Sequence, residues 1–204
     1  MSLQKGLVAH WTMSEDSLQS ATVLADKTPY ENKGTIYGAT FTTDRKGQPN
    51  SAMYFDGVND YIDCGNNSSL NNTFSGSYTV SIWARPQSVD DARFMSKNVY
   101  QFMAFRVGYI KFFNGSYYFL VSTTTPVVGD WYHIVYTYDG ITSKLYVNKN
   151  KEDESSSKFS WFNSQNLEIG RTNAYYKCTL DDVRIYNRAL SQEEITKLYE
   201  SYNK

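Results

Sequence analysis

The sequence predicts an all-β fold, a two-sheet antiparallel jelly-roll sandwich with a short C-terminal helix. Two observations favour this class. About twelve to fourteen short segments rich in aromatic and β-branched residues are separated by turn-forming residues, and the clearest of them alternate between apolar and polar positions. Helical spacing is found at the C-terminal end. A chain of 204 residues fits one domain, residues 1–204.

The first half of the chain contains the predicted strands 7–11 (LVAHW), 53–55 (MYF) and 61–62 (YI). Asp56-Gly57 and Asn59-Asp60 supply the turn between the second and third of these strands. Residues 66–77, NNSSLNNTFSGS, are expected to form a polar loop because they carry few apolar side chains.

The central strand is predicted at residues 78–86, YTVSIWARP. Tyr78, Val80, Ile82 and Ala84 share one face, and Trp83 lies with the polar residues on the other. Four aromatic-rich strands follow, in VYQFMAFRV, GYIKFF, SYYFLVS and WYHIVYTYDG. Residues 148–158, NKNKEDESSSK, are expected to be a solvated loop, and NLEIG forms the penultimate strand.

The closing stretch begins as a strand in which Val183 and Ile185 point toward one face, with Asp181 on the same side. Asp182, Arg184 and Tyr186 are expected on the opposite face. The pattern then becomes helical, and the helix is signalled by three features of the sequence. These are an S-x-x-E capping box at Ser191 and Glu194, a staple between Leu190 and Ile195, and apolar residues Ile195, Leu198, Tyr199 and Tyr202 at helical spacing.

This closing stretch also carries a family resemblance. DDVRIYNRALSQEEI resembles the C-terminal signature of laminin-G-like jelly-roll domains of the concanavalin A-like lectin and glucanase superfamily. Four earlier blocks are similar to the same family in the same order: ADKTPYENKG, FDGVNDY, YTVSIWARP, and WYHIVYTYDG with KLYVN. The first block departs at Pro29, Tyr30 and Glu31, where the family usually has Gly, Asn and Gly. The resemblance covers essentially the whole chain and implies a concanavalin A-like sandwich.

The resemblance also implies a structural calcium ion between the N-terminal loop and the closing strand. Asp26 and Asp181 stand at the positions that would bind it. Calcium requires six to eight oxygen ligands, and few can be named here. The alternative is that Asp181 accepts backbone N–H groups of the loop without a metal.

The sequence predicts no enzyme activity. Glycoside hydrolases on this fold place paired carboxylates in an E-x-D-x-E run, and the sequence has no such run. Glu152, Asp153 and Glu154 are contiguous, so alternate carboxylates point apart. His10 and His133 lie inside apolar strands, where a packed histidine is more common than a catalytic one. A glycoside hydrolase is therefore the least favoured function.

Aromatic residues make up 16% of the chain, with 18 tyrosines, and some are expected on a binding surface. The predicted ligand-binding residues are Tyr100, Arg106, Trp161, Arg171, Tyr175 and Tyr176. Trp83 is expected to lie under a loop rather than on that surface. The predicted function is a carbohydrate-binding or adhesion module that recognises glycans through exposed aromatic rings. The alternative is a protein–protein interaction module of a larger surface or tail protein.

Net charge, hydropathy and cysteine content restrict the classes of partner and the location that we expect. A net charge of −1 gives no case for nucleic acid, and the absence of a long apolar run predicts no membrane insertion. The N-terminal MSLQKGLVAHW lacks the apolar region of a signal peptide, so an extracellular or surface location is expected only as part of a larger protein. Cys64 and Cys178 are predicted to be buried, reduced thiols.

Overall fold

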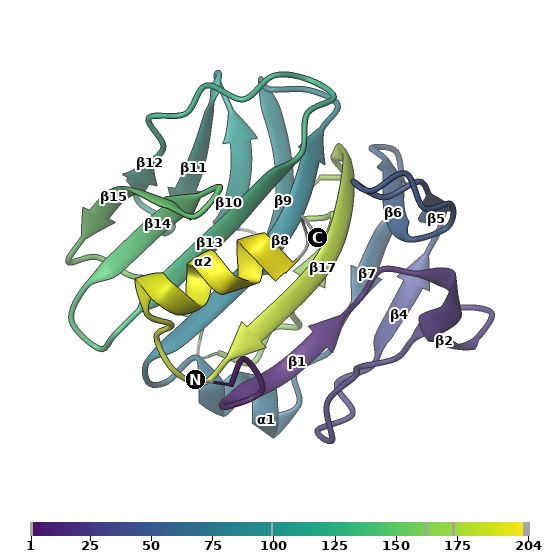
Figure 1. The fold of residues 1–204 in the computed structure, drawn as a ribbon, viewed down its shortest axis with the longest axis horizontal. Coiled ribbons are helices and arrows are strands. Elements are labelled where there is room, and N and C mark those ends of the chain that lie inside the picture. The colour runs from purple at the N-terminus through teal and green to yellow at the C-terminus, as the bar shows by residue number, and fades with distance from the viewer. Residues whose placement is uncertain (1, 99, 162, 173, 202–204) are drawn as a thin grey trace.

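Two antiparallel sheets pack face to face in the computed structural model, which describes residues 2–98, 100–161, 163–172 and 174–201 (Figure 1). The eight-stranded sheet runs β15 (Asn150–Ser155), β14 (Ser143–Val147), β13 (Tyr132–Tyr138), β8 (Tyr78–Pro86), β17 (Lys177–Tyr186), β6 (Ala52–Asp56) and β5 (Thr40–Thr42), with β1 (Leu7–Trp11) paired to β17. The nine-stranded sheet runs β12 (Tyr118–Val121), β11 (Tyr109–Phe113), β10 (Gln101–Arg106), β9 (Asp91–Asn98), β16 (Glu168–Ile169), β7 (Tyr61–Asp63), β4 (Gly34–Tyr37), β3 (Val23–Leu24) and β2 (Leu18–Ser20). The predicted sandwich is confirmed.

The core lies between the sheets and follows the predicted alternation of β8. Val80, Ile82 and Ala84 are buried in one cluster with Phe94 and Phe105 of the other sheet. Each fully buried large apolar side chain contributes about 1.5–3 kcal/mol. Cys64 and Cys178 are free and buried as predicted, and burial raises the pKa of both thiols.

Helix α2 (Gln192–Ser201) lies across the outer face of the eight-stranded sheet, over β13 and β8 (Figure 1). Its predicted capping box is confirmed, because the Ser191 N–H donates to Glu194 Oε2 at 3.0 Å and the Glu194 N–H donates to Ser191 Oγ at 3.3 Å. Ile195 and Leu198 pack in a second apolar cluster with residues of the sheet beneath. Tyr202, predicted in the same helix, lies outside the described residues.

Helix α2 covers Trp83 together with Arg45, which lies in the loop between β5 and β6. The Trp83 ring is 4% exposed and stacks against both His133 and Tyr199, with ring centroids 5.0 Å and 5.6 Å away, and these two rings also contact each other at 6.1 Å. The outer face of the eight-stranded sheet is therefore occupied here by its own helix, and the expectation that Trp83 is covered is correct.

A β-bulge in β17 corrects the predicted position of Asp181. Asp181 pairs with Trp83 and Arg184 pairs with Ser81, so Asp182 and Val183 together oppose one residue of β8. Asp182 adopts a left-handed φ of 47° at this point. The extra residue shifts the alternation by one, which places Asp181 on the Trp83 side instead of the side of Val183.

Asp182 is also buried rather than solvated. His10 Nε2 lies 2.6 Å from Asp182 Oδ1, and Arg184 Nε donates to the same oxygen at 3.2 Å. Burial alone would raise the pKa of Asp182, but the hydrogen bond to His10 and the charge of Arg184 lower it below its ordinary value.

Two polar segments predicted as loops form regular structure. Residues 68–73 form the short helix α1 (Ser68–Thr73), held by the buried ammonium group of Lys97. That group donates hydrogen bonds to Asn66 Oδ1 (2.5 Å), Asn71 Oδ1 (3.1 Å), the Asn163 carbonyl (3.0 Å) and the Gln165 carbonyl (2.9 Å). The loop prediction was wrong because a lysine distant in sequence supplies the donors.

The charged stretch 150–155 is the edge strand β15. Its carboxylates bind the backbone of the facing sheet: Asp153 Oδ2 accepts from the Val121 N–H at 2.8 Å, and Glu152 Oε2 accepts from the Thr123 and Thr124 N–H groups at 2.9 Å. Charged side chains are common on edge strands, where they discourage further pairing. In the described part of the chain, the 3-10 helix η1 (Glu15–Ser17) is the remaining helical element. Across the described residues, no helix is long and apolar enough to cross a membrane.

Candidate binding face

The outer face of the nine-stranded sheet carries a continuous set of aromatic and cationic side chains. Alternation places them there, because their strand neighbours, such as Ile36, Ile62 and Phe112, belong to the core. We call this surface the aromatic face and define it by Tyr37, Tyr61, Arg93, Phe102, Arg106, Tyr109, Lys111, Phe113, Tyr118, Arg171, Tyr175 and Tyr176.

One half of the aromatic face is built on β4 and β7. The Tyr37 and Tyr61 rings pair across the two strands and stack with centroids 4.4 Å apart and an angle of 6°. The Arg171 guanidinium lies 3.9 Å from the Tyr61 ring centroid, and the Tyr175 ring lies 6.2 Å from it. A cation over a ring face is attracted by the ring quadrupole, so these four side chains form one ordered group.

Glu168 fixes the arginine of this group. Arg171 donates to both carboxylate oxygens of Glu168, from Nε at 3.1 Å and from a terminal guanidinium nitrogen. Burial alone would lower the pKa of Arg171, but the hydrogen bond and charge of Glu168 raise it above its ordinary value. Burial also raises the pKa of the Tyr61 hydroxyl group above its ordinary value.

The other half is built on β9, β10, β11 and β12. The Arg93 guanidinium lies 4.0 Å from the Phe102 ring centroid and 5.0 Å from that of Tyr176. Phe113 lies between Phe102 and Tyr118, with ring centroids 5.3 Å and 5.1 Å away. These aromatic contacts make the second half a single packed layer.

Asp91 fixes the arginines of this half. It accepts hydrogen bonds from Arg93 Nε at 3.1 Å and from an Arg106 terminal nitrogen at 2.6 Å. The Lys111 ammonium group lies 5.2 Å from the Tyr109 ring and 5.4 Å from the Tyr118 ring. Arg93 also donates to Thr172 Oγ1 at 3.3 Å, which links this half to the segment that carries Arg171 and Tyr175.

The two halves together offer flat apolar rings beside fixed polar groups. Tyr37 is 44% exposed and stacks on the ring that Arg171 covers, and Tyr109 is 40% exposed and lies beside Lys111. Rings of this kind stack on the C–H faces of sugars, while guanidinium and carboxylate groups bind hydroxyls. The same residue types are frequent in protein interfaces. The geometry is therefore suited to a binding surface.

The structure brings four of the six predicted ligand-binding residues to the aromatic face. These are Arg106, Arg171, Tyr175 and Tyr176, although Tyr176 is only 8% exposed and mainly supports Arg93. Tyr100 is 68% exposed and follows β9 at the end of the sheet.

Trp161 corrects the prediction, because it is fully buried. Its ring stacks on Phe159 with centroids 4.5 Å apart and meets Phe74 edge to face at 5.2 Å. The stretch around it was expected to be an aromatic loop that faces a ligand, but the ring packs into the core cluster. Trp161 is thus unavailable to a surface ligand.

Sequence reasoning missed Tyr37, Tyr61, Arg93, Phe113 and Tyr118. The alternation of inward and outward side chains along the strands could have indicated them, because each is next to a core residue in its strand. What the alternation did not reveal was that β4, β7 and β16 lie side by side in the sheet.

The two predicted calcium ligands each have their own partners. Asp26 Oδ1 accepts from the His10 and Thr28 N–H groups at 2.9 Å, and Oδ2 accepts from Thr28 Oγ1 at 2.7 Å and the Asn32 N–H at 2.9 Å. Asp181 is ion-paired with Arg45. The alternative prediction, that Asp181 accepts backbone N–H groups, is therefore wrong in its partner, because the partner is the Arg45 guanidinium group.

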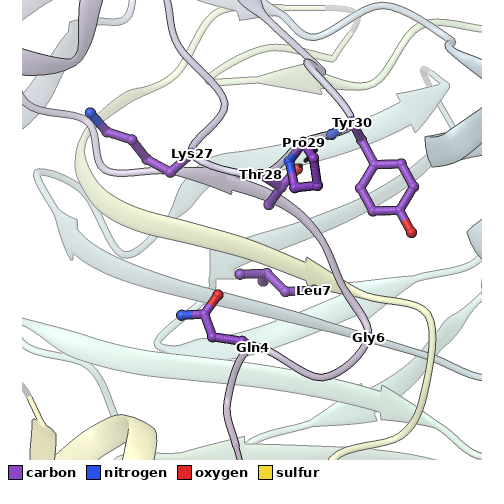
Figure 2. Close-up of a pocket in the computed structure, with 7 residues that line it drawn as sticks. All are labelled: Gln4, Gly6, Leu7, Lys27, Thr28, Pro29 and Tyr30. Atoms are coloured by element: carbon purple, nitrogen blue, oxygen red, sulfur yellow. Dashed lines mark hydrogen bonds between the residues drawn. The ribbon is translucent and has the colours of Figure 1, made fainter.

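This donor set does not fit a shared calcium ion. Both Asp26 oxygens are occupied by hydrogen-bond donors, and the partner of Asp181 is itself a cation. Among the described residues there is no group of three or more His, Cys, Asp or Glu side chains that could hold a metal. Figure 2 shows the loop that Asp26 closes, with Thr28 Oγ1 receiving the Tyr30 N–H at 3.3 Å.

Solved structures with the same fold include binding domains. The binding domain of Paraclostridial Mosquitocidal Protein 1 is 18% identical and has a TM-score of 0.76 over 97% of this chain and 52% of that one. The receptor binding domain of a botulinum neurotoxin C/D mosaic serotype is 15% identical, with a TM-score of 0.75 over 96% of this chain and 51% of that one. The chain thus spans about half the length of these two proteins.

A third structure matches over nearly its full length. Domain 4 of AbnA, a GH43 extracellular arabinanase from Geobacillus stearothermophilus, solved in complex with arabinotriose, is 18% identical, with a TM-score of 0.72 over 95% of this chain and 98% of that one. Identities this low show a common fold. No curated protein sequence gives a significant match to the chain.

The sequence itself matches a family profile over residues 55–196, which is more than half of the chain. That stretch begins in β6 and ends inside α2, so it contains both sheets' central strands and the capping box. The chain therefore belongs to the concanavalin A-like lectin/glucanases superfamily.

Proposed function

We propose that this domain is a non-catalytic carbohydrate-binding module whose binding surface is the aromatic face. The observation that carries the proposal is the ordered group of Tyr37, Tyr61, Arg171 and Tyr175, in which ring and guanidinium planes are fixed before any ligand arrives. Prearranged groups lose little conformational entropy on binding, which favours a shallow site. The arabinotriose complex of a domain with this fold lends support.

The hydrogen bonds made by the carboxylates of the aromatic face support a binding role over a catalytic one. Retaining hydrolysis needs two carboxyl groups about 5–5.5 Å apart, one as acid and one as nucleophile. Asp91 and Glu168 instead each hold arginines through hydrogen bonds. Their role in the proposal is to position Arg93, Arg106 and Arg171.

A protein partner is the second candidate. Tyrosine and arginine are enriched among residues that dominate protein interfaces, and two structures with this fold are described as a binding domain and a receptor binding domain. In either case we propose that the domain works outside the cell as part of a larger protein, by analogy with the extracellular arabinanase.

A glycan array probed with the domain alone tests the proposal, with arabinotriose included among the sugars. We expect binding that Tyr175→Ala weakens about tenfold or more, since a lost ring contact of about 1.4 kcal/mol has that effect. Tyr117→Ala is the matched control, because Tyr117 is 53% exposed and stands outside the aromatic face. No sugar bound, together with a specific protein partner that Tyr175→Ala disrupts, would favour the second candidate.

A further inference from the structure

Tyr30 stands between two hollows at the end of the sandwich that carries the N-terminal turn. The first has a volume of about 340 Å³ and is lined by Gln4, Gly6, Leu7, Lys27, Thr28, Pro29 and Tyr30 (Figure 2). The second has a volume of about 240 Å³ and is lined by Val8, Tyr30, Ser69, Asn72, Thr73 and Asn187. Tyr30 lines both and is 49% exposed.

The loop that carries Tyr30 is held rigidly. Asp26 accepts three hydrogen bonds from this loop and a fourth from the His10 N–H of β1, and Thr28 Oγ1 also lies 3.0 Å from the Val8 carbonyl oxygen. Pro29 restricts its own φ, and Glu31 adopts a left-handed φ of 53°, which is unfavourable for a residue with a side chain. Strain of this kind persists where the surroundings enforce it and is frequent at functional sites.

The opposite wall is equally fixed. The Asn187 N–H donates to the Gly6 carbonyl at 2.8 Å, and Arg188 Nε donates to the Lys5 carbonyl at 2.8 Å. Gly6 has a φ of 75°, and a Cβ atom there would lie 2.7 Å from Asn187 Oδ1. The first hollow therefore exists before a ligand binds, and its volume is within the range of small-molecule sites.

The groups around Tyr30 suit a neutral polyhydroxy ligand. Within the described residues, the side-chain amides of Gln4, Asn72 and Asn187 make no hydrogen bond to protein, so each can donate to and accept from hydroxyl groups. Lys27 is the one charged side chain that lines either hollow in the described part of the chain. An exposed ring with free amides on both sides favours an uncharged ligand over an anion.

We infer that Tyr30 is the stacking platform of a second carbohydrate subsite, which takes one neutral sugar residue beside the ring. The inference rests on the proposed carbohydrate-binding function but concerns a different part of the surface. Tyr30 comes from the loop residues that depart from the family pattern, so this subsite is a property of this chain's own sequence.

An NMR titration of the ¹⁵N-labelled domain with arabinose, glucose, galactose, mannose and N-acetylglucosamine tests the inference. We expect at least one sugar to shift the amide signals of Lys27, Tyr30, Asn72 and Asn187. Tyr30→Ala should lower the affinity at these signals about tenfold, and Tyr30→Phe should keep it within about threefold, because the ring face is retained. Tyr117→Ala, at an exposed tyrosine outside both hollows, should leave the affinity unchanged.

The outcomes separate this inference from the proposed function. Shifts confined to the aromatic face would overturn the second subsite and leave the proposed function in place. Shifts near Tyr30 that survive Tyr30→Ala would also overturn it, because the ring would then not be the platform. No shift with any sugar, at either place, would count against both.

Discussion

Replacing Glu194 by glutamine should lower the stability of the domain by an amount that depends on pH. Glu194 is 3% exposed, and its carboxylate accepts hydrogen bonds from two Arg188 nitrogens at 2.7 Å and 2.8 Å and from the Ser191 N–H at 3.0 Å. These contacts lie at the helix N-terminus, where negative charge is stabilising. Glu194→Gln keeps the shape of the side chain and removes its charge.

The expected loss follows from the pKa of this group. The Arg188 hydrogen bond, the largest favourable cause, lowers the pKa of Glu194 from 4.5 to about 2. At about 1.36 kcal/mol for each pH unit this corresponds to about 3.4 kcal/mol. Arg188 is 24% exposed, so solvent screening reduces the effect, and we expect a loss of about 2 kcal/mol at pH 7.

The sign of the pH dependence is fixed by the direction of the shift. A carboxyl group whose pKa is lowered by folding stabilises the protein above its unfolded pKa, and this contribution is lost as pH falls through the folded value. The two proteins should therefore differ at pH 7 and approach each other between pH 4.5 and about 2.

Urea denaturation followed by tryptophan fluorescence measures this difference, since Trp83 lies under the helix. Glu193→Gln is the matched control, because Glu193 is an exposed neighbour that pairs with Lys197 on the same helix, and we expect little change. Equal stability of Glu194→Gln and the parent protein at pH 7, or a gap that stays constant down to pH 3, would refute the reasoning.

Three further predictions concern stability. Burial lowers the pKa of His133 to about 3, so the unfolded chain takes up a proton before the folded one as pH falls below 6.5. The free energy of unfolding should therefore fall by up to about 1.4 kcal/mol per pH unit between pH 6.5 and 5. A urea midpoint that stays constant over this range would contradict a buried, neutral His133 ring. Ser191→Ala removes an acceptor in the capping box and should cost about 1 kcal/mol, and an unchanged urea midpoint would mean that this hydrogen bond contributes nothing to helix docking. Because Asp26 and Asp181 are occupied by protein donors, EDTA should leave the melting temperature unchanged; a lower value that Ca²⁺ restores would instead support the calcium ion that the family resemblance implies.

The elements that sequence could predict are those defined by local patterns. The capping box at Ser191 and Glu194 depends on four consecutive residues, and the alternation of β8 depends on nine. Both are confirmed because nothing distant in sequence competes with them. The alternation of β17 failed at Asp182, since a bulge is decided by the register of the neighbouring strand β8.

The candidate site was harder to predict because it depends on the order of strands. Arg171 and Tyr175 were recognised as binding residues, but their contact with Tyr61 arises because β16 lies between β9 and β7. Trp161 failed for a similar reason. It lies in a loop whose aromatic residues could face solvent or the core, and its contact with the distant Phe74 places it in the core.

A crystal of the domain soaked with the tightest-binding sugar from the glycan array tests the central claim most directly. The account predicts sugar density over the aromatic face, with a ring stacked on Tyr37 or Tyr175 and a hydroxyl group bound by Arg171. Density that leaves the aromatic face empty and lies only elsewhere on the domain would contradict the claim.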